Sequence, residues 1–553
     1  MPSSIKSVLR RLEVKHDGEV YSDRPPTRWG NRDVFPVPLE QRRYTVISYV
    51  SYWSIASLSV TSWAYGGSVI ALGLSAGEGI ACSVIGSLFV GLFAFLCGHP
   101  GASMHVGFTA LARVTFGLYG SYIPVLLLVF ENVIFFGIHA YFGGLAVTIV
   151  LNALSSSFMH WKNTLPESAG GVTSQGLIGF VIYFVVFFLL LLIHPSKLRN
   201  LVWPAAITIA VVFLGLLGWA ISANGGTVGN LLAGKIHLSS TNKSFAMLYA
   251  ISSAAGSATA FSSRVSDWTR FAVTKHSATV PMLVFAPIFG CIGPIFGILA
   301  TSAVYSRYQA VEWNPLGLLL YVQATQYTAG CRAATFFAGL GLFCASLMNN
   351  LMGKISCAGM DCAGLFPKYI TTRRGSYILT VIGILIQPWR LVNGSSTFLT
   401  VLASFGVFVA PMTGILAADY WIVRRRKWVM HDIYRQDGIY WYTFGVNWRA
   451  YVAFIMSFVF DLPGFAASVN KTSIAPGWTR MYDMSYIVNL AIAVLIFCCL
   501  SFAFPPKGLG VAEGWDDGSV VGENKVTDPT VAVEQEKEER VYEVECLPPA
   551  PAN

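Results

Sequence analysis

The chain has 553 residues, of which 54% are apolar and only 12% charged, and its net charge is +9. A soluble globular protein has about 25% charged residues, so this composition excludes water as the main solvent. The basic residues are scattered through tails and short connections rather than gathered in a stripe, which argues against nucleic acid as a partner. The ten cysteines lie mostly singly and lack CxxC spacing, so they indicate neither a metal site nor a disulfide framework.

Apolar stretches recur from Tyr44 to Phe504 and predict a transmembrane domain over residues 45–505. About 20 helical residues cross a hydrocarbon core about 30 Å thick. The spans must be helical, because lipid offers the backbone no hydrogen-bond partner. We therefore expect an all-α polytopic membrane protein with about twelve spans, near residues 45–68, 78–97, 121–151, 174–194, 200–222, 244–262, 280–304, 334–357, 376–390, 397–422, 448–467 and 484–505.

A polar arm, residues 1–44, precedes these spans, and an acidic tail, residues 506–553, follows them. Prolines disfavour a helix in the arm, and the tail lacks apolar periodicity, so we expect the tail to be disordered. Basic residues concentrate in the arm and in alternate loops, which predicts that both termini are cytoplasmic. The glycosylation motifs at Asn242, Asn393 and Asn470 then all lie outside.

Two spans have small or glycine-rich centres. The first contains residues 62–67, with Trp63, and the sixth contains residues 255–260, with Ser257. Interrupted helices five spans apart are typical of inverted-repeat transporters, whose substrate sites lie at the interruptions. Trp63 and Ser257 are therefore candidate substrate-binding residues. The alternative is that small residues only permit close helix packing.

Several motifs point to one family. They are Gly98-His-Pro-Gly101, Asp267-Trp-Thr-Arg270, Asp419-Tyr-Trp421 and Gly445-Val-Asn-Trp-Arg-Ala450. Together they resemble the fungal uracil, uridine, allantoin and thiamine permeases, the Fur-type branch of the nucleobase-cation-symport-1 family. The resemblance implies a LeuT-type core of two inverted five-helix repeats, two further helices, and alternating access driven by a proton or sodium gradient.

The same resemblance implies substrate-binding residues in the third and eighth spans. Phe135 and His139 lie four residues apart on one helix face, where the family has an aromatic residue and a Gln. Asn350 and Lys354 also lie four residues apart, and the family usually has Asn at the second of these positions. His139 either contacts substrate or bonds to a neighbouring helix. Lys354 either meets the substrate or proton, or pairs with Glu131 or Asp361.

The sequence also departs from the family's pattern in the sixth span and at the residues that would bind a coupling ion. Phe261 is its only ring near the expected site, and Arg264 adds a base near the inner mouth. Asp267 and Arg270 form either a local helix-end pair or a cytoplasmic gate. Met348 stands where sodium-coupled relatives offer hydroxyl ligands, which favours protons. The candidate proton carriers are His139, Lys354, Glu131 and Asp361.

We therefore predict a proton-coupled plasma-membrane permease that imports a nucleobase, nucleoside, allantoin or vitamin-like heterocycle and needs no cofactor. Lys354 further predicts an acidic substrate, because an ammonium near the midplane is costly without a partner. No phosphate-binding GxxxxGK[ST] loop supports ATP use, and no metal or nucleophile constellation supports an enzyme. A receptor derived from a permease, which binds without transport, remains the alternative.

Overall fold

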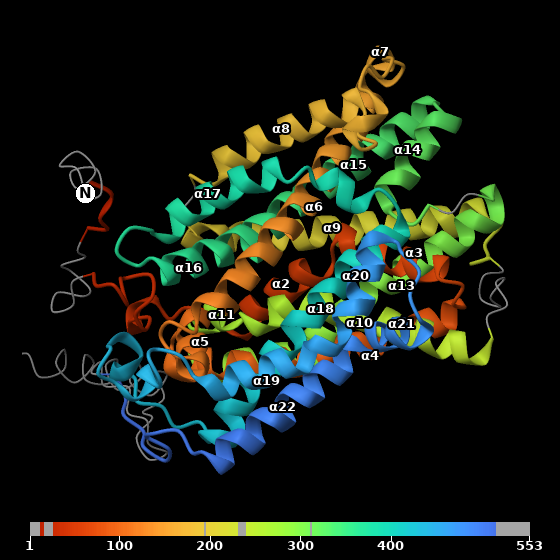
Figure 1. Cartoon of the computed structure of the whole chain (residues 1–553). Coiled ribbons are helices and arrows are strands. Elements are labelled where there is room, and N and C mark those ends of the chain that lie inside the picture. Colours follow the sequence, from red (N-terminus) through yellow and green to blue (C-terminus); the bar gives the residue numbers. More distant parts are fainter. Residues whose placement is uncertain (1–10, 16–25, 193–194, 230–238, 310–311, 516–553) are drawn as a thin grey trace, which may run out of the picture.

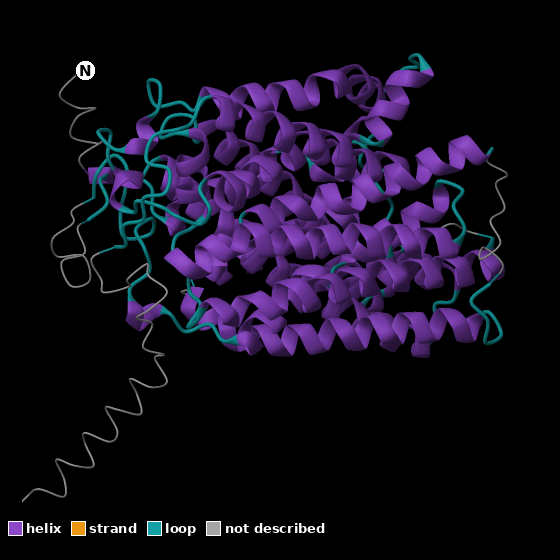
Figure 2. Ribbon diagram, turned by 90° about the horizontal axis from the view of Figure 1, so that it is seen from below, coloured by secondary structure: helices purple, strands orange, loops and turns teal. Residues whose placement is uncertain are grey.

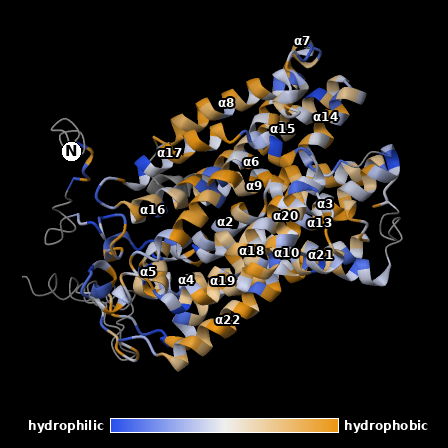
Figure 3. Ribbon diagram, viewed as in Figure 1, coloured by the Kyte–Doolittle hydropathy of each residue, from blue (hydrophilic) through white to orange (hydrophobic). Residues whose placement is uncertain are grey.

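The computed structural model describes residues 11–15, 26–192, 195–229, 239–309 and 312–515. Within these ranges the chain is helical, without a strand, and the long helices run side by side with loops gathered at the two ends (Figures 1 and 2). Eight helices of this part are long and apolar enough to cross a membrane. The ribbons of α8 (Ser174–Leu190) and α22 (Ser485–Ala503) are coloured mainly as hydrophobic residues (Figure 3), as expected of helices that face lipid.

In the part of the chain that the structure describes, ten segments form the core of the bundle and two more follow them. The first five are α2 (Val46–Ser57) with α3 (Val60–Ala71), α4 (Ala76–Met104), α6 (Tyr122–Leu154), α8 (Ser174–Leu190) and α9 (Pro195–Ala223). The second five are α10 (Ser240–Ser263), α12 (Lys275–Val280) with α13 (Ala286–Tyr308), α15 (Ala329–Asn349) with α16 (Ser356–Leu365), α17 (Thr372–Leu385) and α18 (Ser395–Ala418). The last two are α19 (Trp448–Phe458) with α20 (Leu462–Asn470), and α22 (Ser485–Ala503).

Shorter helices connect these segments. The α-helical connections are α5 (Phe108–Phe116), α7 (Ser156–Met159), α11 (Ser266–Thr269), α14 (Pro315–Thr325) and α21 (Pro476–Asp483). Among the described residues, the π-helical turns η4 (Pro281–Phe285) and η5 (Asn350–Ile355) lie within spans, and a further one, η7 (Asp419–Val423), continues α18 at its end. The 3-10 turns are η1 (Leu39–Gln41), η2 (Glu167–Ala169), η6 (Pro388–Val392), η8 (His431–Tyr434), η9 (Ile439–Trp441) and η10 (Val459–Asp461).

The first span is broken between α2 and α3, at Leu58 and Ser59. Ser59 caps α3, because its hydroxyl accepts a hydrogen bond from the backbone N–H of Ser62 at 3.2 Å. The expected break at residues 62–67 is wrong, since these residues continue α3. Their glycines allow close packing instead: a Cβ on Gly66 would lie 2.1 Å from the carbonyl oxygen of Pro294 in α13.

The sixth span differs from expectation in the same way. Residues 255–260 lie inside the continuous helix α10, where Gly256 packs against Gly406 of α18. α10 ends at Ser263 with Arg264 as its C-cap, and the short helix α11 follows it. The first span is therefore broken, as the inverted-repeat hypothesis predicts, whereas the sixth span α10 is continuous.

The described part of the N-terminal arm packs across one end of the bundle, beside α5 and α11 (Figure 1). Asn31 donates to the carbonyl oxygen of Pro367 at 2.8 Å, and Asp33 accepts from the N–H of Thr372 at 2.9 Å. Residues 506–515 also pack here, since the N–H of Met430 donates to the carbonyl oxygen of Glu513 at 3.1 Å. The predicted disorder of the tail does not hold for these residues, and the rest of the tail lies outside the described residues.

Candidate functional site

A cavity of about 130 Å³ lies where the broken first span faces α4, α6, α10 and η5. An apolar cavity of about 150 Å³ holds one benzene molecule, so this volume suits a single ring with small substituents. None of the described residues that line it is Asp or Glu. Its ring-bearing and cationic side chains are Trp53, Tyr65, Phe135, His139, Phe261 and Lys354.

The cavity brings together most, but not all, of the predicted substrate residues. Phe135, His139, Ser257, Phe261 and Lys354 line it.

Two predicted residues are turned away from the cavity. The Asn350 amide donates to the carbonyl oxygen of Phe136 at 3.1 Å and to the hydroxyl of Tyr183 at 2.9 Å. Trp63 packs edge-on against Phe213, with 4.9 Å between ring centroids. Asn349 lines the cavity in place of Asn350.

His139 makes hydrogen bonds with both ring nitrogens. Its Nδ1 lies 2.8 Å from the carbonyl oxygen of Phe135, which can only accept, so Nδ1 carries a proton. Its Nε2 lies 2.6 Å from the hydroxyl of Thr61, which lies 3.1 Å from the hydroxyl of Ser59. A neutral His139 therefore accepts from Thr61, and the ring is connected to the break in the first span.

Lys354 lies between two aromatic rings at the cavity wall. Its Nζ lies 4.8 Å from the ring centroid of Phe135 and 5.8 Å from that of Phe261. The side chain is buried, with 8% of its surface exposed. Among the residues that the structure describes, its ammonium makes neither a hydrogen bond nor an ion pair. Cation–π attraction is its main favourable contact.

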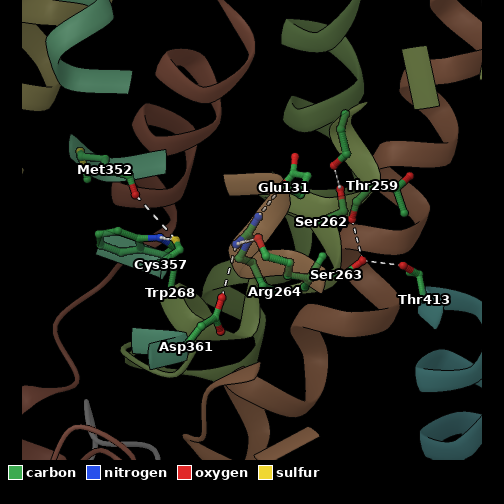
Figure 4. Close-up of polar contacts among 12 residues, drawn as sticks. Glu131, Thr259, Ser262, Ser263, Arg264, Trp268, Met352, Cys357, Asp361 and Thr413 are labelled. Carbon is green, nitrogen blue, oxygen red and sulfur yellow. Dashed lines mark hydrogen bonds and ion pairs between the residues drawn. The ribbon is translucent and has the colours of Figure 1, made fainter. Parts of the chain in front are cut away.

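The two acids proposed as partners of Lys354 pair with Arg264 instead (Figure 4). Arg264 Nη2 lies 2.7 Å from Glu131 Oε2, and Nη1 lies 3.4 Å from Asp361 Oδ2. All three side chains are at most 1% exposed. Arg264 follows the last residue of α10, so this cluster joins the sixth span to α6 and α16.

Each member of this charge cluster retains bonding capacity. Glu131 Oε1, Asp361 Oδ1 and Arg264 Nε have no hydrogen-bond partner among the described residues. Two carboxylates share one guanidinium, which leaves one negative charge in excess if both are ionised. A buried uncompensated charge is costly, so such a group favours binding a proton or rearranging.

Comparisons with known proteins identify the family. Residues 36–489 match the family model described as permease for cytosine/purines, uracil, thiamine and allantoin. The chain belongs to this family. The match confirms the resemblance drawn from the motifs.

Curated relatives cover most of this permease. Transporter aclS of Aspergillus oryzae is 31% identical, with 90% of this chain and 91% of the relative covered. Thiamine transporter THI72 of Saccharomyces cerevisiae is 32% identical, covering 91% and 83%. The uridine permease of the same yeast is 30% identical, covering 92% and 82%. These relatives are transporters and permeases, so the chain is a membrane transporter and not an enzyme.

A solved structure supports the fold. Mhp1, a nucleobase-cation-symport-1 family transporter with bromovinylhydantoin bound, superposes with a TM-score of 0.64 at 20% identity. The match covers 86% of this permease and 97% of Mhp1. It confirms the predicted core of two inverted five-helix repeats with two further helices.

Aromatic side chains of the permease form a layer beside the cavity. Phe261 stacks on Tyr52 with 5.3 Å between centroids and meets Trp53 edge-on at 5.4 Å. Tyr52 also contacts Trp268, at 5.3 Å. The ring of Trp53 lines the cavity, and its buried Nε1 has no hydrogen-bond partner among the described residues. The sequence analysis missed Trp53, which lies four residues before the end of α2.

Asp267 and Arg270 lie near one another beside Gly107, and each also bonds to a different segment. Asp267 Oδ1 accepts from the N–H of Phe108 at 2.8 Å, at the start of α5. Arg270 donates to the carbonyl oxygen of Asp33 at 2.7 Å. These bonds tie α11 to α5 and to the N-terminal arm.

Proposed function

We propose that this permease imports a small, flat nitrogen heterocycle across the plasma membrane by proton symport, with both termini cytoplasmic. The observation that carries the proposal is the ring-sized cavity at the broken first span, which combines aromatic faces with convergent polar groups. Helix interruptions near the midplane are where secondary transporters bind their substrates. The family assignment supports a small heterocycle as the cargo.

Binding combines stacking with hydrogen bonding. Phe135 and Phe261 offer faces for a planar ring, and base–aromatic stacking contributes about 1–3 kcal/mol in nucleic-acid sites. Thr61 and Asn349 supply hydroxyl and amide groups at the same wall. His139 acts through Thr61, because its two ring nitrogens already have partners.

Protons couple to transport through the charge cluster of Arg264, Glu131 and Asp361. A proton on one carboxylate removes the excess negative charge and loosens its contact with Arg264. That change is suited to release the sixth span from α6 and α16 during alternating access, because the cluster joins these elements. Arg264 also lies next to α11, whose contacts with the arm close the proposed inner end.

The environment of the broken first span disfavours sodium. In sodium-coupled transporters, carbonyl oxygens freed by an interruption bind the cation. In this permease the Asn349 amide donates to the carbonyl oxygen of Ile55 at 3.0 Å, so a protein donor occupies that acceptor. The adjacent side chains Met348 and Met352 are buried and offer sulfur, whereas sodium, a hard cation, needs oxygen.

The test is radiolabelled uptake of uracil, allantoin and nicotinamide in cells that lack their own permeases. Expected is accumulation in sodium-free medium that a protonophore abolishes. Accumulation that requires sodium and survives the protonophore would refute proton symport. Binding without accumulation would identify a receptor.

A further inference from the structure

We propose that the substrate of this permease is an anion: a small heterocycle whose carboxylate pairs with the ammonium of Lys354. This inference rests on the proposed uptake of a heterocycle and narrows its chemical class. It is carried by two residues that line the cavity and whose polar groups have no hydrogen-bond or ion-pair partner among the described residues: Lys354, which is 8% exposed, and Trp53, which is 1% exposed.

The first step concerns the charge of Lys354. Glu131 and Asp361 are paired with Arg264, and the cavity lining contains no acid. The ring faces of Phe135 and Phe261 attract the ammonium but cannot accept strong hydrogen bonds from it. A buried ammonium without a counter-ion is unfavourable, so its missing partner has to come from the cavity.

The second step concerns Trp53, whose indole N–H is an independent observation. Trp53 lines the cavity, is 1% exposed, and its indole N–H has no acceptor among the described residues. It meets Phe261 edge-on at 5.4 Å, and Lys354 Nζ lies 5.8 Å from the same ring. An ionised carboxylate only accepts hydrogen bonds and has two oxygens, so one oxygen can bind the Lys354 ammonium while the other remains available to a second donor such as the Trp53 indole. A charge-assisted bond is also about twice as strong as a neutral one.

The third step concerns how the ring binds. In the empty cavity the Lys354 ammonium rests over the face of Phe135. A carboxylate offers that ammonium a stronger partner than the ring does, so Nζ moves to it and the Phe135 face becomes free for stacking. A neutral ring offers Lys354 at most a carbonyl oxygen, which is a weaker partner than a carboxylate, and a cationic ring places two positive charges together. The site therefore selects acids over amides and amines.

The experiment compares matched pairs that differ by the acidic group: orotate with uracil, nicotinate with nicotinamide, and hydantoin-5-acetate with hydantoin. Uptake is measured in cells lacking their own permeases, and the melting temperature of the purified native permease is measured with each compound. We expect at least one acid to be preferred by tenfold or more in uptake, and the same acid to raise the melting temperature.

Variants test the residues. Lys354→Asn is expected to lose tenfold or more of the uptake of the preferred acid while retaining or gaining uptake of its neutral partner. Trp53→Phe keeps the ring and loses the donor, and should reduce uptake of the acid alone. Lys275→Asn makes the same chemical change at an exposed lysine outside the cavity, and it should leave the uptake of the acid and of its neutral partner unchanged.

The two hypotheses fail differently. If native cells accumulate the neutral members and no acid is preferred, the anion hypothesis is overturned and heterocycle uptake stands. If no compound of either kind accumulates or shifts the melting temperature, both fall. If Lys354→Asn reaches the membrane but loses acid and neutral compounds in equal proportion, Lys354 serves coupling rather than recognition. The native comparison and Trp53→Phe decide the matter even if Lys354→Asn does not fold.

Discussion

Replacing Arg264 with Gln removes the cation that two buried carboxylates share. Glu131 and Asp361 lie 2.7 and 3.4 Å from the guanidinium, and neither acid is exposed. Breaking a buried ion pair costs about 3–5 kcal/mol, because a charge remains buried without a partner. Folded proteins are stable by only about 5–15 kcal/mol, so Arg264→Gln should reduce the amount of permease at the membrane.

The functional effect is measured per molecule that reaches the membrane. Uptake is normalised to surface abundance and followed across external pH. We expect the normalised uptake of Arg264→Gln to fall at least about tenfold, which corresponds to about 1.4 kcal/mol. We also expect its uptake no longer to respond to the proton gradient. Arg264→Lys keeps the charge but not the two-armed geometry and should give an intermediate result.

A double variant separates folding from coupling. Arg264→Gln with Glu131→Gln removes one charge of each sign, so abundance should recover relative to Arg264→Gln alone while proton-dependent uptake stays low. Arg264→Gln that reaches the membrane at native levels with an unchanged pH response would refute the reasoning.

Further substitutions at Phe135, Thr61 and the neighbouring Asn349 and Asn350 test the cavity. Phe135→Ala should reduce uptake about tenfold or more at normal surface abundance, whereas Phe135→Trp keeps a stacking face and should retain it; equal uptake would make Phe135 a packing residue. Thr61→Val leaves His139 Nε2 without its 2.6 Å partner and should slow uptake about five- to tenfold, and Thr61→Ser should restore it. Asn350→Ala should lower abundance without changing substrate preference, whereas Asn349→Ala should reduce uptake itself; the reverse pattern would contradict their assignment.

The fold could be predicted because the apolar spans have the length that a bilayer requires. The exact interruptions could not, because glycines serve both broken helices and close packing. Gly66 and Gly256 allow close packing of helices. The signal that marks the first break is the pair Ser59 and Ser62, which forms the capping box at the start of α3.

The eighth span shows why the site was predicted only in part. A regular α-helix places residues four apart on one face, which predicted Asn350 together with Lys354. Residues 350–355 instead form the π-helical turn η5, in which the repeat is one residue longer. Asn349 therefore shares the cavity wall with Lys354. The pairing of Arg264 with Glu131 and Asp361 could not be predicted from residue spacing either, because the three residues lie far apart in the sequence.

The buried charges predict how membrane potential affects uptake of an acid. The substrate carboxylate neutralises Lys354, Arg264 neutralises one carboxylate of its cluster, and the coupling proton neutralises the other, so one anion enters with one proton. Moving a single charge across 100 mV involves about 2.3 kcal/mol. An anion and a proton that cross together carry no net charge, so the membrane potential does no work on them. In vesicles containing the purified permease, an imposed pH gradient should therefore drive orotate uptake, whereas an imposed potential should not. A neutral ring carried by Lys354→Asn should respond to both. Orotate uptake that increases with an inside-negative potential would show that more than one proton enters, and the one-for-one balance of charges would be wrong.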